Sequence, residues 1–155
     1  MPARLQDEIK QTKPFPRRSS EALLAVLRTA SVLDQALNDA LRPHGITSTQ
    51  YNVLRILRGA GEAGLCGREV GQRLVSSVPD VSRLLDRMEE TGLVRRERDP
   101  NDRRHVTARI TAKGLRIAED CGPALESVER HRVGDLDAKT LETVIGALAA
   151  IREPG

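Results

Sequence analysis

Arginine is concentrated in two short stretches of this sequence. The first, residues 95–104, contains Arg95, Arg96, Arg98, Arg103 and Arg104 together with Glu97, Asp99 and Asp102. The second, residues 77–87, contains Ser77, Pro79, Asp80, Ser82, Arg83 and Arg87. A guanidinium group forms paired hydrogen bonds with phosphate or guanine, and a serine hydroxyl can bond to either. Residue types in both stretches therefore favour contact with a nucleic acid.

The charge of the whole chain does not decide this point. Its 155 residues include 25 lysines and arginines against 22 acidic residues, for a net charge of +3. Only Lys10, Lys13, Lys113 and Lys139 are lysines, so arginine supplies nearly all of the positive charge. An arginine-rich overall composition explains that excess as well as ligand binding does. The placement of the arginines has to distinguish the two.

The second stretch is predicted to open a helix that follows a tight turn. Apolar spacing predicts one helix from Cys66 to Leu74, a break at residues 75–77, and a second helix that Gly92 ends. We expect Ser77 to cap the second helix, with Asp80 at its third position and Pro79 in its first turn. This pattern is typical of a helix-turn-helix, in which the N-terminal residues of the second helix reach base edges.

Two residues of this helix have competing interpretations. Asp80 could accept a hydrogen bond from a cytosine amine, but we favour a role in completing the cap with Ser77. Arg83 is placed to grip guanine or phosphate, and Arg87, one turn further, is better placed for phosphate.

The first stretch is predicted to be the tip of a β-hairpin. Residues 93–98 and 105–110 alternate as strands do, and Asp99-Pro100-Asn101-Asp102 has the composition of a turn. A basic β-tip can insert an arginine into the minor groove of DNA, where negative potential is focused. The alternative is a solvated run of charges that pair with one another. Because the predicted hairpin directly follows a helix-turn-helix, we favour insertion of its tip into the minor groove.

Apolar helices flank this central region on both sides. The pattern predicts helices from Ser20, as N-cap, to about Arg42, from Thr47 to about Arg58, over residues 112–132, and over residues 137–152. Thr47 and Gln50 match a capping box, Thr111 can cap the helix after the hairpin, and Gly122-Pro123 should bend that helix. Residues 1–16, with three prolines, read as an arm.

Residues 81–111 resemble the winged-helix segment of the multiple-antibiotic-resistance regulator (MarR) family. The resemblance lies in Val81 to Gly92, in Leu93-Val94-Arg95-Arg96, in Asp99 to Arg104, and in Val106 to Thr111 followed by Gly114. The resemblance extends upstream to Glu69-Val70, Arg73-Leu74, Thr49-Gln50-Tyr51 and Leu54. It covers nearly the whole chain from about residue 20.

The resemblance implies a mainly α fold with a small β-hairpin wing, flanked by long N- and C-terminal dimerisation helices. It implies an arm over 1–16, a dimerisation helix over 17–45, a winged helix-turn-helix over 46–111 and C-terminal dimerisation helices over 112–155. An apolar surface too large for one small domain to bury also favours a two-fold dimer.

The same resemblance implies a transcriptional regulator, usually a repressor, that binds a pseudo-palindromic DNA operator. Asp102 is expected to orient Arg104 for the minor groove. A small aromatic or phenolic anion, bound between the dimerisation helices and the winged region, is expected to weaken DNA binding.

Several other classes of protein find no support in the sequence. Cys66 and Cys121 have neither metal-ligand spacing nor a disulfide framework. The sequence also has no motif of the common enzyme classes and no phosphate-binding loop. We therefore expect no catalysis and no cofactor. No stretch is apolar enough to cross a membrane, and we expect a cytoplasmic protein. Two alternatives stay open: a redox-responsive regulator that uses Cys66, and a winged-helix module that binds protein.

Overall fold

The structure, a computed structural model, describes residues 4–155 and is mostly helical. The helices are α1 (Leu5–Glu8), α2 (Arg18–Leu41), α3 (Ser48–Ala60), α4 (Gly67–Arg73), α5 (Val81–Glu90), α6 (Ala112–Asp120), α7 (Gly122–Val133) and α8 (Ala138–Arg152). The strands are β1 (Leu65–Cys66), β2 (Val94–Arg98) and β3 (Val106–Ile110). The predicted fold class, mainly α with a small β wing, is confirmed.

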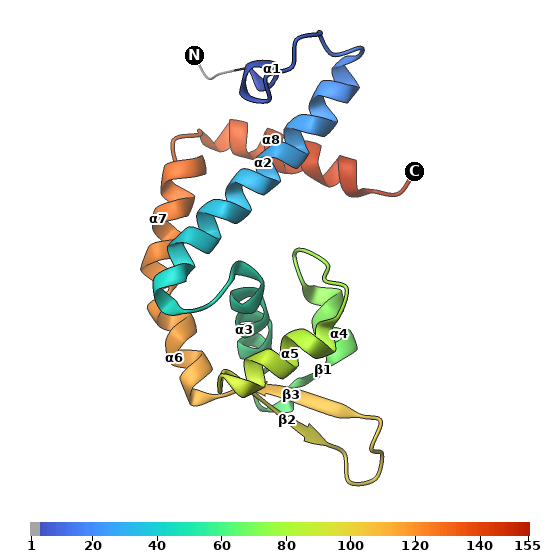
Figure 1. Cartoon of the computed structure of the whole chain (residues 1–155), viewed down its shortest axis with the longest axis vertical. Coiled ribbons are helices and arrows are strands. Elements are labelled where there is room, and N and C mark those ends of the chain that lie inside the picture. Colours follow the sequence, from blue (N-terminus) through green and yellow to red (C-terminus); the bar gives the residue numbers. More distant parts are fainter. Residues whose placement is uncertain (1–3) are drawn as a thin grey trace.

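The chain forms an open, C-shaped body with two ends (Figure 1). Helices α2 and α8 lie at one end together with residues 4–16 of the N-terminal arm, and α3 to α5 and the sheet form the other end. Helix α7 packs along α2 and continues from α6, so it connects the two ends. The α2/α8 end is therefore separate in space from the sheet, whereas α6, which also belongs to the predicted segment 112–155, packs against α3 in the winged end.

The hydrophobic core lies almost entirely in the winged end. Leu54 and Leu57 of α3, Val70 of α4 and Met88 of α5 are fully buried there. Of the described residues, α7 and α8 contribute no buried side chain, although α8 is rich in apolar residues. The winged end therefore has a core of its own, while the α2/α8 end leaves apolar surface exposed.

Helix α3 begins at the predicted capping box. The Gln50 N–H donates to Thr47 Oγ1 at 3.2 Å, and the Thr47 N–H donates to Gln50 Oε1 at 3.1 Å. Ser48 then joins this helix start to α2, because its N–H donates to Asn38 Oδ1 and its hydroxyl to Asp34 Oδ1. The winged end is thus attached to α2 through the first turn of α3.

The start of α5 differs from the prediction. Asp80, not Ser77, is the N-cap: its Oδ1 accepts a hydrogen bond from the Arg83 N–H at 2.9 Å. Pro79 lies before the helix rather than in its first turn. A proline disfavours helical backbone in the residue before it, here Val78, which opposes a helix start at Ser77.

The sheet has three strands in the order β1–β3–β2, whereas the sequence predicted only the hairpin. The hairpin register joins Val94 to Ile110 and Arg98 to Val106, with β2 and β3 antiparallel as expected. The unexpected strand β1 pairs Leu65 with Ala108. Because β1 directly precedes α4 in the chain, the pairing of β1 with β3 joins the wing to the helix-turn-helix.

Three other boundaries also differ. Helix α2 begins at Arg18, so Ser20 lies inside it and is not its cap. The predicted 112–132 helix divides into α6 and α7 at Cys121, where Pro123 removes a backbone N–H. The arm contains the short helix α1, whose Glu8 is ion-paired to Arg28 of α2 at 3.8 Å. The predicted cap Thr111 is confirmed, and Asp137 caps α8.

Across residues 4–155, none of the helices combines the length and the hydropathy needed to span a bilayer.

Candidate nucleic-acid interface

Helix α5 presents one buried face and one charged face. Leu85 and Met88 face the core, while Ser82, Arg83 and Arg87 are exposed. Ser77 and Pro79 are exposed in the turn that leads into the helix. The helix is therefore braced from behind by α4 and the core, with its predicted contact residues facing solvent.

The tip of the wing is a compact turn rather than a loose loop. The Asn101 N–H donates to Asp99 Oδ1 at 2.8 Å, and the Asp99 N–H donates to the His105 carbonyl at 2.9 Å. Asp102 Oδ1 accepts from the backbone N–H of Arg104 at 3.0 Å. Asp102 thus fixes the backbone of Arg104, and the guanidinium group of Arg104 extends from a fixed point.

The arginines of this region fall into two groups. Within residues 4–155, no hydrogen bond or ion pair engages the guanidinium groups of four arginines, Arg83, Arg87, Arg103 and Arg104, all of which are exposed. The other three wing arginines are engaged: Arg95 with Glu97, Arg96 with Asp86 and Glu89, and Arg98 with the Arg103 carbonyl. The four in the first group belong to the predicted contact set.

The two features lie at the same end of the molecule. Figure 1 shows the N-terminal end of α5 and the tip of the wing on the same side of the winged end. Two exposed cationic features at this placement suit a duplex whose major groove receives α5 and whose minor groove receives the wing. The predicted self-paired charge run describes Arg95, which pairs with Glu97, but not Arg98 or the arginines of the tip.

Comparison with known proteins identifies the family. The MarR family pattern matches residues 44–105. The HTH-type transcriptional regulator TtmR of Methylorubrum extorquens (strain PA1) is 34% identical over 139 residues, which span 86% of this chain and 67% of TtmR. The chain belongs to the MarR family. It is thus a winged-helix, DNA-binding transcriptional regulator.

Solved structures of the MarR family share its architecture. A mutant of E. coli MarR complexed with operator DNA superimposes with a TM-score of 0.73 at 26% identity, covering 97% of this chain and all of that one. CouR from Rhodococcus jostii RHA1, bound to p-coumaroyl-CoA, gives 0.69 at 25% identity, covering 91% of this chain and 98% of CouR.

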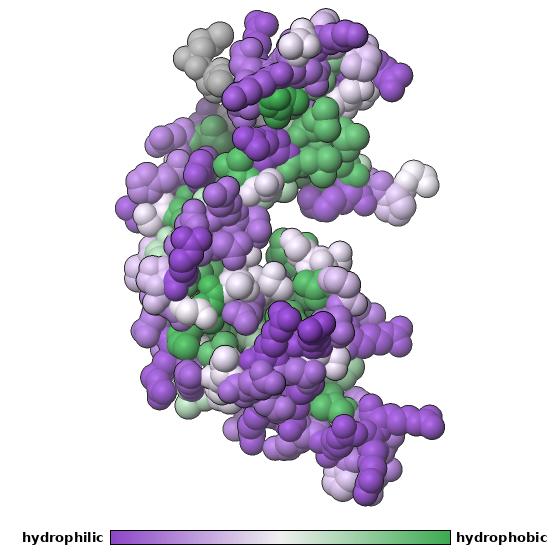
Figure 2. Space-filling view, viewed as in Figure 1, coloured by the Kyte–Doolittle hydropathy of each residue, from purple (hydrophilic) through white to green (hydrophobic). Residues whose placement is uncertain are grey.

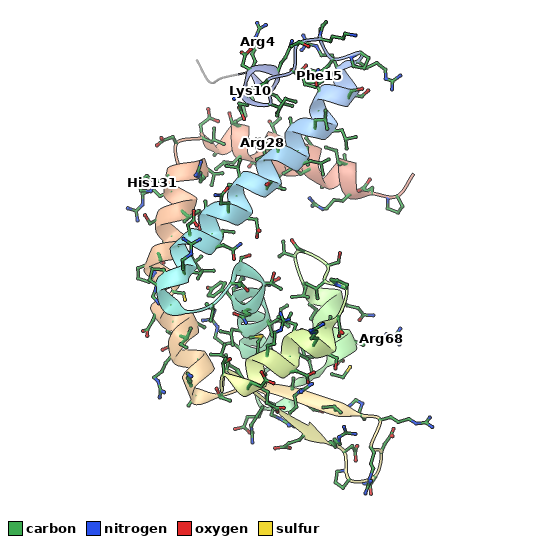
Figure 3. All side chains as sticks on the ribbon, in the orientation of Figure 1. Arg4, Lys10, Phe15, Arg28, Arg68 and His131 are labelled. Carbon is green, nitrogen blue, oxygen red and sulfur yellow. The ribbon has the colours of Figure 1, made fainter. Side chains whose placement is uncertain are left out.

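One cation of this MarR-family chain was not singled out from the sequence. Arg68 is exposed at the start of α4 and projects from it on the side toward which the wing extends (Figure 3). Its position in the first turn of the supporting helix, two residues after the N-cap Cys66, was a usable signal. It is a candidate phosphate contact beside the predicted set.

A cleft of about 700 Å³ separates the two ends of the molecule. Its walls are α2, α3, α7 and the turn before α5, and Figure 2 shows the molecule hollowed between the α2/α8 end and this turn. The apolar part of its lining consists of Leu33, Leu37, Tyr51, Leu125 and Val128. Its charged lining residues are Asp34, Arg55, Glu126, Glu129 and Arg132.

The two cysteines occupy different environments. Cys121 is fully buried between α6 and α7, and burial raises the pKa of its thiol, so the reactive thiolate is disfavoured. Cys66 is half-buried as the N-cap of α4, and its backbone N–H donates to Glu69 Oε2 at 2.9 Å. This hydrogen bond lowers the pKa of Glu69.

Proposed function

We propose that this protein is a homodimeric repressor that binds a pseudo-palindromic operator and is released from it by a small aromatic effector. In this proposal α5 enters the major groove and the wing enters the minor groove. Arg83 reads a base or phosphate, Arg87 and Arg103 contact phosphates, and Arg104 enters the minor groove. Ser77 and Ser82 add hydrogen bonds to phosphate, Pro79 and Asp80 shape the helix start, and Asp102 holds Arg104. The protein would act in the cytoplasm.

The observation that carries the proposal is the group of four arginines without partners within residues 4–155. A cation that already pairs with a carboxylate has to give up that partner before it binds phosphate. Arg83, Arg87, Arg103 and Arg104 avoid this cost, and they lie on the two elements that face the same side. Release of DNA counterions by such cations makes binding strongly dependent on salt.

Dimerisation is supported by the apolar surface of the α2/α8 end. Leu23 and Leu27 of α2 are 59% and 58% exposed, and Ile145 of α8 is 64% exposed. Figure 2 shows hydrophobic residues gathered over this end and hydrophilic ones over the wing. We assign dimerisation to segments 17–45 and 112–155 and DNA binding to segment 46–111. Of the predicted arm 1–16, residues 4–16 lie beside the proposed dimer contact, and residues 1–3 lie outside the described residues.

The DNA-binding proposal is tested by selecting duplexes from a randomised library with the purified protein. A two-fold dimer predicts recovery of an inverted repeat whose half-sites lie about 34 Å apart, one turn of DNA. Ile145→Glu should yield monomers in sedimentation experiments and should recover no inverted repeat. An enriched single half-site bound by a wild-type monomer would contradict the proposal.

The cleft is the proposed effector site because its apolar walls fit an aromatic ring. Arg55 and Arg132 could bind the acidic group of an anion, whereas Asp34 already accepts hydrogen bonds from Ser48 and Asn38. CouR, a related structure, holds an aromatic acyl thioester. Glu126 and Glu129 line the same cleft and favour a cationic effector as the second candidate.

An effector screen separates these two candidates. The thermal shift of the protein is measured with aromatic carboxylates, aromatic amines and neutral aromatic alcohols of matched size, in the presence and absence of the selected duplex. Carboxylates should raise the melting temperature of the free protein and displace it from DNA. Arg132→Gln should abolish the response to carboxylates, and Glu129→Gln should abolish a response to amines.

The two alternative functions make different predictions. A redox-responsive regulator should lose DNA affinity after peroxide treatment, and Cys66→Ser should remove that loss. A winged-helix module that binds protein should recover no enriched duplex at all from the library.

A further inference from the structure

Arg96 on β2 contacts the recognition helix α5 rather than solvent. Its Nη2 donates to Asp86 and, at 3.2 Å, to Glu89 Oε1. Its backbone N–H donates to Glu89 Oε2 at 2.8 Å. Asp86 and Glu89 are three residues apart on α5 and therefore lie on one face of that helix. Three hydrogen bonds thus connect the second strand of the wing to α5.

The surroundings of this ion pair distinguish it from an ordinary surface pair. The side chain of Arg96 is only 19% exposed, whereas those of Asp86 and Glu89 are 54% and 41% exposed. Arg96 Nε is buried and has no hydrogen-bond partner within residues 4–155. Partial burial lowers the pKa of Arg96, but its bonds to Asp86 and Glu89 outweigh this and raise it. The two carboxylates therefore stabilise the charge of the Arg96 guanidinium at a position that is partly shielded from water.

The neighbouring wing arginines make no such contact. Arg95 pairs with Glu97 of its own strand, and Arg98 binds the Arg103 carbonyl within the wing. Of the five arginines in residues 95–104, Arg96 is the one whose side chain bonds to α5 within the part of the chain described. It therefore has a different role from the arginines of the tip.

We propose that Arg96 is a positioning residue that sets the orientation of the wing relative to α5, so that Arg83 and Arg104 reach adjacent grooves of one duplex at the same time. This inference rests on the DNA site proposed above. Arg96 itself does not contact DNA, because its guanidinium is occupied by two carboxylates. A carboxylate pair on a DNA-binding helix opposes phosphate, and neutralising that pair is a second consequence of the same contact.

The expected effect follows from the linkage between the two grooves. When two contacts belong to one rigid body, the second binds at a high effective concentration after the first has formed. A wing whose orientation is free loses that advantage, although every DNA-contacting residue is still present. Loss of Arg96 should therefore remove the wing contact while leaving the α5 contact in place.

The test compares Arg96→Ala with the matched control Arg95→Ala, using a duplex selected from a randomised library by the wild-type protein. Hydroxyl-radical footprinting reports the minor groove, and guanine methylation protection reports the major groove. Arg96→Ala should lose the minor-groove protection by the wing, keep the major-groove protection, and bind about tenfold more weakly. Arg95→Ala should keep both protections. An unchanged footprint for Arg96→Ala overturns the proposal.

Charge reversal separates positioning from a general loss of structure. Arg96→Glu and Glu89→Arg should each lose the wing footprint. The double variant that carries both substitutions should recover it, because the two exchanged side chains again have opposite charges and can bond to each other. Circular dichroism and melting temperature establish that each variant is folded. If Arg96→Ala does not fold, Asp86→Asn, at a half-exposed carboxylate, gives the same comparison. A folded double variant without wing protection contradicts the proposal.

The design also distinguishes failure of the positioning role from failure of the DNA site. If the wild-type protein gives no minor-groove protection, both the proposed site and the role of Arg96 are wrong. If the wild-type protein gives it and Arg96→Ala matches it, only the role of Arg96 is wrong.

Discussion

Asn52 of α3 accepts a hydrogen bond through Oδ1 from the backbone N–H of Val75, at 2.8 Å. Both residues line the cleft, and Val75 lies in the turn that leads into α5. Val75 is 88% exposed, so this bond rather than burial attaches the turn to α3. An effector in the cleft would meet the segment that positions the recognition helix.

Replacement of Asn52 should therefore affect regulation more than stability. Asn52→Ala leaves the Val75 N–H near solvent, so we expect a loss of about 1 kcal/mol or less in the free energy of unfolding. We expect operator affinity to fall several-fold and the effector response to shrink. Amide hydrogen exchange at Val75 should accelerate relative to the wild-type protein. Unchanged exchange would show that this bond does not hold the turn.

The cap of α5 can be assigned by a pair of substitutions. Asp80→Ala should destabilise the protein by about 1 kcal/mol, because the Arg83 N–H loses its acceptor. Ser77→Ala should change stability by less than about 0.5 kcal/mol, since Ser77 is exposed in the turn. Urea unfolding measures both. The opposite order would restore Ser77 as the cap.

Two glycines beside the wing should respond differently to alanine. Gly61 and Gly64 both have positive φ, +60° and +64°, so alanine is strained at each by about 1–3 kcal/mol. Only at Gly64 would the added Cβ meet backbone, 2.6 Å from the Ala108 carbonyl oxygen of β3. Gly64→Ala should therefore destabilise the protein more than Gly61→Ala in thermal unfolding. Equal losses would mean that β1 and β3 separate at little cost.

The N-cap at Asp137 should make the contribution of α8 to the free energy of unfolding depend on pH in the acid range. Hydrogen bonds from Thr140 lower the pKa of Asp137 below its ordinary value of 3.8 in the folded protein. Its contribution is therefore fully present above the ordinary pKa and is lost as the pH falls through the lowered folded pKa.

Asp137→Asn should remove this dependence. The difference in unfolding free energy between the wild-type protein and the variant should shrink as the pH falls through that window. Asp135→Asn, at an exposed neighbour, is the control. A constant difference across the acid range would contradict the cap assignment.

Local signals explain what the sequence predicted well. The caps at Thr47 and Thr111 each depend on a residue three positions away, so their partners are visible in a short stretch of sequence. The hairpin was visible for the same reason, because its two strands are joined by one turn.

Features that depend on distant partners were missed. Strand β1 has two residues, and its partners Thr107 and Ala108 lie about forty positions downstream, so no local pattern marks it. The distinct role of Arg96 depends on how β2 packs against α5, and composition alone could not separate it from Arg104. The cleft likewise requires α2, α3 and α7 to be placed together.

The central claim is that exposed arginines on α5 and on the wing tip bind one DNA duplex. Its most direct test is the salt dependence of affinity for the selected duplex, for the wild-type protein, Arg104→Ala and the control Arg95→Ala. We predict a steep fall in affinity with salt, a slope reduced by about one for Arg104→Ala, and an unchanged slope for Arg95→Ala. A flat salt profile for the wild-type protein, or equal slopes for all three proteins, would contradict the claim.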